Sequence, residues 1–175
     1  MENLEFNRLL LHTAFSCMAC DGNIDNREVK MIKSLHHEKT AFGEIDIESD
    51  LESLRQEINQ DSTTFLKGYF QELSNAELTE TNELKLIEIA IDTINADKKV
   101  EYSEIKFFKV IRSMLKVKDE AVLDKYPHFE EYLEQDIISG DYLSKLQKDY
   151  FGTHIINKVF DADSFSSDIT LSDND

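Results

Sequence analysis

The sequence has few of the residues that break a helix or form a tight turn. Its 175 residues include one proline, five glycines and no tryptophan. An all-β protein needs frequent turn signals, whereas this chain consists mainly of long runs rich in Leu, Ile, Lys and Glu. The composition therefore predicts an all-α fold. A hydrophobic content of 41% is enough for a substantial core in one domain, expected over residues 1–155.

Basic residues and cysteines are also scarce. Nineteen Lys and Arg stand against 36 Asp and Glu, so the formal net charge is −17. Such a charge repels nucleic-acid phosphates and anionic lipids. We therefore expect no nucleic-acid partner, and instead a basic or membrane-associated protein partner or a divalent cation. Two cysteines are too few for a disulfide scaffold and fit a reducing compartment.

Long apolar runs are missing as well. No run approaches the ~20 residues needed to span a bilayer, and the first residues lack the basic start of a signal peptide. We expect a cytoplasmic protein with no direct membrane insertion. Residues 161–175 contain five Asp, four Ser and no Lys or Arg, which predicts an acidic disordered tail.

Apolar residues recur at spacings of three and four along most of the chain, as expected for amphipathic helices. The predicted helices cover residues 4–20, 26–37, 49–59, 64–73, 82–96, 102–115, 118–125, 128–138 and 142–151. The first has too many apolar residues for a narrow stripe and is predicted to be central and mostly buried. In the second, Lys30 and Lys33 are predicted to face water. Gly43 marks a loop, and Pro127 ends the helix before it.

An acidic loop occurs twice. Asp21-Gly-Asn-Ile-Asp-Asn-Arg-Glu28 returns 76 residues later as Asp97-Lys-Lys-Val-Glu-Tyr-Ser-Glu104. The match extends into the apolar segments on both sides. The repeated unit is therefore helix, acidic loop, helix, with copies near residues 4–37 and 82–115.

Helix initiation explains part of this repeat. With Asp25 as N-cap, Glu28 occupies the third helical position and can form a capping box, while Ile24 and Val29 form a hydrophobic staple. The second copy has the same four positions, filled by Val100, Glu101, Glu104 and Ile105. A cap of this kind stabilises a helix by about 1 kcal/mol without any ligand.

Capping does not explain Asp21 and Asp97, which follow the C-terminal ends of predicted helices. An anion there is destabilised by roughly 0.3–1 kcal/mol, because it faces the negative end of the helix dipole. Two interpretations remain: a turn in which the Asp oxygen accepts backbone N–H groups, or a calcium or magnesium ion held by carboxylates. An EF-hand is excluded, because the loop glycine is at position 2 and position 12 is Ile32.

The first loop has the pattern acid-Gly-x-Ile-acid-x-x-Glu, lies between apolar helices and follows the small residues Ala19 and Cys20. In these respects the chain resembles the TerB-like family, which includes the tellurite-resistance TerB proteins and the N-terminal domain of the DjlA co-chaperones. The resemblance covers roughly residues 4–150. It implies a compact all-α fold and a role in a stress response or in assemblies near the inner face of the membrane.

The resemblance also implies that the two acidic clusters form a divalent-cation site or an acidic interaction surface. The implied metal ligands are Asp21, Asp25, Glu28, Asp97, Glu101 and Glu104. The second copy departs from the pattern, because Lys98 replaces the glycine and Lys99 adds another positive charge.

Other candidate sites have simpler explanations. Cys17-Met-Ala-Cys20 lies inside an apolar helix and is expected to supply small buried residues rather than a zinc or redox site. The aromatic residues are expected to pack between helices, and the alternative is that a subset of them forms a groove for a partner. We find no matched nucleophile and base, so catalytic residues are not assigned.

The expected function is a TerB-like accessory protein that binds a cation or a protein partner. The alternatives are a structural adaptor without metal and, more weakly, a metal-dependent hydrolase.

Overall fold

The computed structural model describes residues 2–20, 26–39, 41–96 and 102–133, together with Ile24 and Val100. These residues are helical and contain no strand, which confirms the predicted all-α fold. The helices are α1 (Glu2–Ala19), α2 (Asn26–Lys39), α3 (Ile47–Gln60), α4 (Ser62–Asn75), α5 (Glu80–Ile94), α6 (Tyr102–Met114), α7 (Asp119–Lys125), the 3₁₀ turn η1 (Pro127–Phe129) and α8 (Glu130–Leu133).

Some predicted elements lie outside the described residues. These are the helix over 142–151, the tail over 161–175 and the second half of the helix over 128–138. None of the described helices is both long and apolar enough to cross a membrane.

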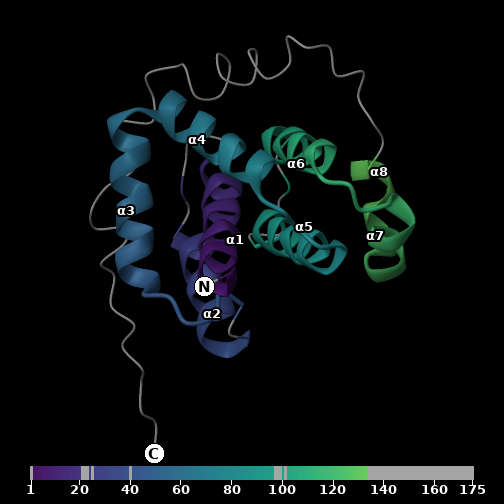
Figure 1. The fold of residues 1–175 in the computed structure, drawn as a ribbon, viewed down its shortest axis with the longest axis horizontal. Helices are drawn as coiled ribbons and strands as arrows, with labels where there is room; N and C mark the ends of the chain where they lie inside the picture. Colours follow the sequence, from purple (N-terminus) through teal and green to yellow (C-terminus); the bar gives the residue numbers. More distant parts are fainter. Residues whose placement is uncertain are drawn as a thin grey trace, which may run out of the picture.

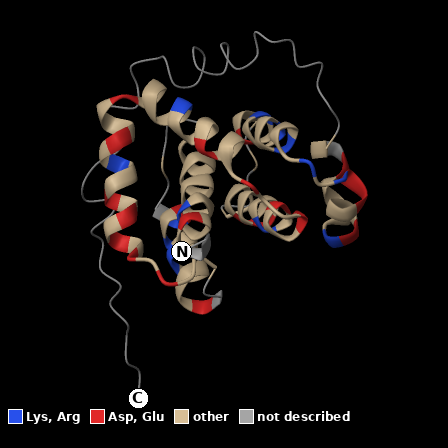
Figure 2. Ribbon diagram, viewed as in Figure 1, with Lys and Arg blue, Asp and Glu red and all other residues tan. Residues whose placement is uncertain are grey.

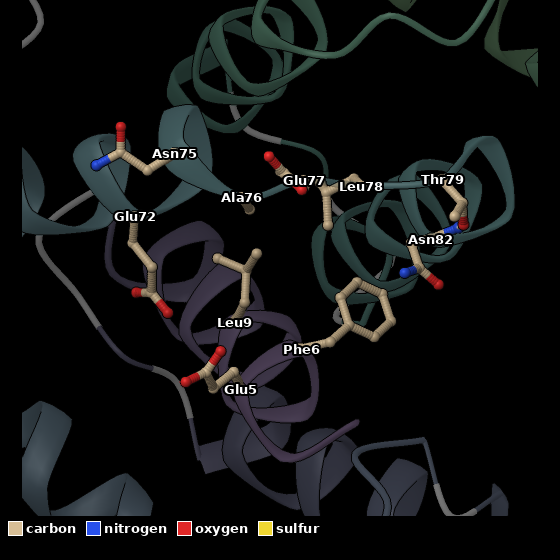
Figure 3. A pocket seen from close by; sticks show the side chains of 10 residues that line it. All are labelled: Glu5, Phe6, Leu9, Glu72, Asn75, Ala76, Glu77, Leu78, Thr79 and Asn82. Carbon is tan, nitrogen blue, oxygen red and sulfur yellow. The ribbon is translucent and has the colours of Figure 1, made fainter. Parts of the chain in front are cut away.

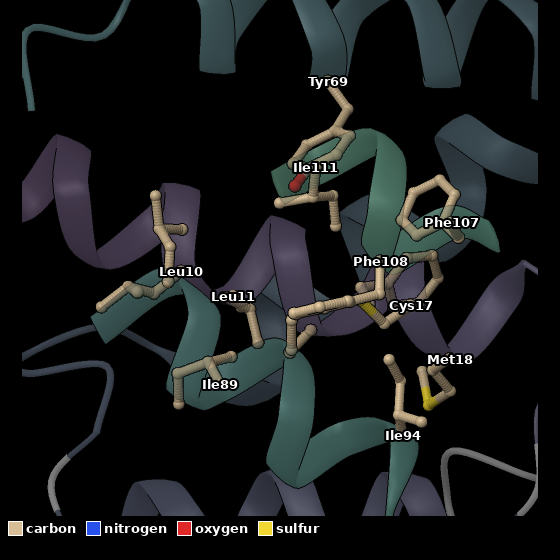
Figure 4. Close-up of a cluster of buried hydrophobic side chains, with 14 of the residues drawn as sticks. Leu10, Leu11, Cys17, Met18, Tyr69, Ile89, Ile94, Phe107, Phe108 and Ile111 are labelled. Carbon is tan, nitrogen blue, oxygen red and sulfur yellow. The ribbon is translucent and has the colours of Figure 1, made fainter. Parts of the chain in front are cut away.

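Helix α1 lies at the centre of the described structure, as predicted. It packs against α3, α4, α5 and α6, and its most extensive contact is with α5, the first helix of the second repeat (Figure 1). From Leu9 to Cys20 every residue except His12 is buried. Figure 4 shows Leu10, Leu11, Cys17 and Met18 within the cluster of side chains contributed by α5, α6 and Tyr69. The exception to the predicted burial is Leu4, which is 42% exposed.

Side-chain caps determine where several helices begin. Asp46 accepts a hydrogen bond from the Ser49 backbone N–H, so α3 begins at Ile47, two residues before the predicted start. Asp61 ends α3 and begins α4, because its Oδ1 accepts the N–H groups of Thr63 and Thr64. Each cap of this kind contributes about 1 kcal/mol.

Lys33 does not face water as predicted. Its side chain reaches from α2 to α3, where Nζ lies 2.9 Å from the Glu48 carboxylate, and the residue is only 8% exposed. Lys30 is exposed, as expected. The prediction for Lys33 was wrong because helical spacing identifies a face but not the acidic partner that a neighbouring helix places against it.

The loop between α6 and α7 is held by a buried carboxylate. Glu83 on α5 is 5% exposed, and its Oε2 accepts the backbone N–H groups of Lys116 at 2.8 Å and Val117 at 2.5 Å. On the other side of the loop, Arg112 donates to the carbonyl of Val117 and to the carboxylate of Asp119. Glu83 therefore ties the second repeat to the segment that leads into α7.

The loop after α2 approaches α1 closely at Gly43. This glycine has a φ of +60°, and a Cβ built on it would lie 2.1 Å from Nδ2 of the buried Asn7 side chain. Both the backbone conformation and the close approach therefore require glycine.

We expect Gly43→Ala to lower the free energy of unfolding by at least about 1–2 kcal/mol, the cost of a left-handed residue that carries a Cβ. Gly68→Ala is the matched control, because Gly68 lies inside α4 and has open space around its Cβ position. That change should stabilise by about 0.5–1 kcal/mol. Urea unfolding of the wild type and the two variants measures both changes in the free energy of unfolding. Equal changes for the two variants would contradict the described loop.

We also expect Glu83→Ala to lower the free energy of unfolding by about 2–3 kcal/mol, because the N–H of Val117 stays buried without its acceptor. The control is Glu88→Ala on the same helix. Glu88 pairs with Lys125 at 2.8 Å, with the two side chains 36% and 50% exposed, so its loss should cost less than about 1 kcal/mol. A larger loss for Glu88→Ala in urea unfolding would overturn this ranking.

Candidate functional site

The repeated acids are only partly within the described residues. Asp21, Asp25, Asp97 and Glu101 lie outside them. Glu28 and Glu104 are described, and they occupy equivalent places in the first turns of α2 and α6. The two helices are described from Asn26 and Tyr102, which are themselves equivalent in the repeat.

Both described acids are buried. Glu28 is 7% exposed and Glu104 is 6% exposed. The N-cap residues described at other helices, Asp46, Asp61 and Thr79, are exposed, whereas Glu28 and Glu104 occupy the third helical position. The apolar residues of the first loop are buried as a staple requires, with Ile24 at 6% and Val29 at 3% exposure. In the second copy, Val100 and Ile105 are half-buried.

The carboxylates of Glu28 and Glu104 both affect the pKa of one thiol, that of Cys17. Burial raises the pKa of Cys17 at the C-terminal end of α1, and the carboxylates of Glu104 and Glu28 raise that pKa further. Two acids that are 76 residues apart in sequence therefore raise the pKa of the same buried thiol of the central helix. The sequence predicted the equivalence of these acids but not their electrostatic effect on Cys17.

The oxygen donors of Glu28 and Glu104 suit a hard cation such as calcium or magnesium. Within the described residues, no group of three or more His, Cys, Asp or Glu side chains could hold a metal ion. Four of the six predicted ligands lie outside these residues, so the metal site stays a prediction.

The two cysteines are free and buried, as expected for Cys17-Met-Ala-Cys20. The aromatic residues also pack as expected. Tyr69 of α4 stacks on Phe107 of α6 at 6.2 Å between ring centroids, and Phe108 meets Phe129 edge to face at 5.8 Å. These rings join helices and do not line the groove described below.

A charged surface is formed by α3 and its flanking residues. Residues 44–61 contain seven acids and a single basic residue, Arg55, and Figure 2 shows the acids along this helix. Arg55 is itself paired with Glu52, and this hydrogen bond, with a second from Gln56, lowers the pKa of Glu52 to about 2. We call residues 44–61 the α3 acidic face.

A groove lies at the other end of α1. It has a volume of about 710 Å³ and is formed by the first half of α1, the end of α4, the connection to α5 and the start of α5. Its lining residues are Glu5, Phe6, Leu9, Glu72, Asn75, Ala76, Glu77, Leu78, Thr79 and Asn82 (Figure 3). We call it the α1–α4–α5 groove. Sequence reasoning missed it, because its residues come from separate segments that share no motif.

One wall of the groove is supported by a histidine. His12 Nδ1 donates to the Glu72 carboxylate over 2.8 Å, and the His12 ring packs against Phe65 and Tyr69 at 4.9 and 5.0 Å. Its Nε2 atom is buried and has no hydrogen-bond partner within the described residues. His12 thereby fixes the position of one groove carboxylate.

Comparison with known proteins adds no identification. No family model, no curated protein and no solved structure matches this chain. The resemblance to the TerB-like family therefore depends on the repeated loops alone.

We expect the native cysteines to resist alkylation. At about pH 8 iodoacetamide reacts with thiolates, and burial with two nearby carboxylates keeps Cys17 protonated. Mass spectrometry should find both cysteines unmodified in the native protein and both modified in guanidinium. Rapid labelling of the native protein at Cys17 would show that the thiol is accessible.

Proposed function

We propose that this protein is a TerB-like accessory protein of a stress response, which binds a divalent cation through the acids of its two repeats. The ligands would be Glu28 and Glu104 together with Asp21, Asp25, Asp97 and Glu101. A calcium or magnesium ion there would neutralise part of the negative charge of these carboxylates. The α3 acidic face is the proposed contact surface for a basic protein partner.

The observation that supports the cation proposal is the burial of two equivalent acids, Glu28 and Glu104, in the first turns of α2 and α6. Removing a carboxylate from water costs free energy unless its charge is compensated. Both carboxylates interact within the protein, and oxygen donors at equivalent places in the two repeats also suit a hard cation.

The proposed partner surface is supported by charge. The α3 acidic face uses part of its charge within the protein, since Lys33 pairs with Glu48 and Arg8 approaches Asp50 at 3.8 Å. Acids remain in excess along residues 44–61, and an excess of one sign attracts a partner of the other sign and speeds its association.

The cation proposal predicts metal-dependent stability. In chelator-treated protein, adding calcium or magnesium to about 100 times its dissociation constant should raise the free energy of unfolding by about 2.7 kcal/mol. Asp21→Asn should abolish most of this gain, because the amide can still accept the hydrogen bonds of a turn but lacks the negative charge. Thermal unfolding with and without metal gives the measurement.

The matched control is Asp61→Ala, which removes a described cap distant in sequence from both loops. It should lower stability by about 1 kcal/mol equally with and without metal. If the wild type gains no stability from either ion, and Asp21→Asn behaves like the wild type, the acids serve only as caps and turns.

A further inference from the structure

We propose that the α1–α4–α5 groove docks a basic amphipathic segment of a partner protein, with an apolar side chain on the groove floor and Lys or Arg side chains at its rim. This surface is separate from the proposed cation site. Leu9 and Ala19 are ten residues apart on α1, which corresponds to roughly 15 Å along the helix.

The floor of the groove is apolar. Leu9 is buried, whereas Phe6, Ala76 and Leu78 are only partly buried and pack against the core. Figure 3 shows Phe6 and Leu9 side by side on α1, with Leu78 on the opposite side of the groove. A volume of about 710 Å³ is within the range of ligand pockets, about 300–1,000 Å³, so an inserted apolar side chain has room.

The rim of the groove is negative. Three of its lining residues are the acids Glu5, Glu72 and Glu77, and none is Lys or Arg. Helix α4 ends at Asn75 in the groove, so the negative end of its dipole adds to the same field. The positive end of α5 is already met by the Thr79 cap and by acids in its first turn.

The acidic rim of the groove determines which kind of partner segment can bind there. Acidic rim groups around an apolar floor are complementary to a helix or extended segment that alternates apolar and basic residues. A second copy of this chain, with a net charge of −17, is repelled by the same rim. Polar side chains at the α5 end of the groove, Thr79 and Asn82, can form hydrogen bonds with the partner backbone.

The test uses labelled peptides of about 14 residues, a length at which an isolated helix is marginal and becomes ordered on binding. One peptide carries Leu and Lys at helical spacing, a second has Ser in place of Leu, and a third has Glu in place of Lys. Fluorescence anisotropy with the full chain should show binding of the Leu/Lys peptide, much weaker binding of the Ser/Lys peptide and none of the Leu/Glu peptide.

Two variants locate the binding. Glu77→Lys reverses one exposed rim charge and should weaken the binding of the Leu/Lys peptide by about three- to tenfold. Ala76→Phe fills the groove without changing charge, at a residue whose extended backbone accepts an aromatic side chain, and should abolish the preference for Leu over Ser. Circular dichroism checks that both variants remain folded.

Glu120→Lys is the control, because it makes the same charge change at an exposed position on α7, outside the groove. The peptide affinity of Glu120→Lys should stay within about twofold of the wild-type value. If Glu120→Lys weakens binding as much as Glu77→Lys, or if Ala76→Phe leaves the preference for Leu unchanged, the peptide is adsorbed by net charge and the docking proposal is overturned. Metal-dependent stability is measured separately, so either proposal can fail alone.

Discussion

The burial of the second half of α1 is the constraint on which the rest of this fold depends. Polar side chains in a buried helix cost free energy unless its neighbours offer them hydrogen bonds. Thr13 donates to the Leu9 carbonyl at 2.8 Å and accepts from the Tyr69 hydroxyl at 3.1 Å, and His12 reaches Glu72. Helix α4 is therefore held to α1 by polar contacts as well as apolar ones, whereas α5 packs through aliphatic side chains.

This constraint also determines where binding can occur. The sides of α1 are covered by α3, α4, α5 and α6, so its two ends are the places where it contributes to a surface or to a loop. The C-terminal end carries Cys17, whose pKa is raised by the carboxylates of Glu28 and Glu104. The N-terminal half supplies Phe6 and Leu9 to the groove. Two proposed sites with different partners are thus attached to one helix.

Much of the helical framework could be predicted from sequence, because helix periodicity and caps are local properties. The central position of α1 followed from its apolar residues, and the equivalent starts of α2 and α6 followed from the repeat. Tertiary partners could not be predicted. Lys33 is buried because α3 places Glu48 against it, and Glu83 is buried because a loop 33 residues later supplies two N–H groups. The groove is a surface of the assembled fold, so no single segment indicates it.

The repeated loops illustrate how a local and a tertiary explanation can be separated. Capping and stapling are the local explanation predicted for the residues at the starts of α2 and α6, and they would act in an isolated helix. The burial of Glu28 and Glu104 and their effect on the pKa of Cys17 are tertiary features, since they exist only when α1, α2 and α6 are assembled. Glu28 and Glu104 already interact within the protein, so the cation proposed for the repeated loops would add to these interactions rather than replace a missing partner.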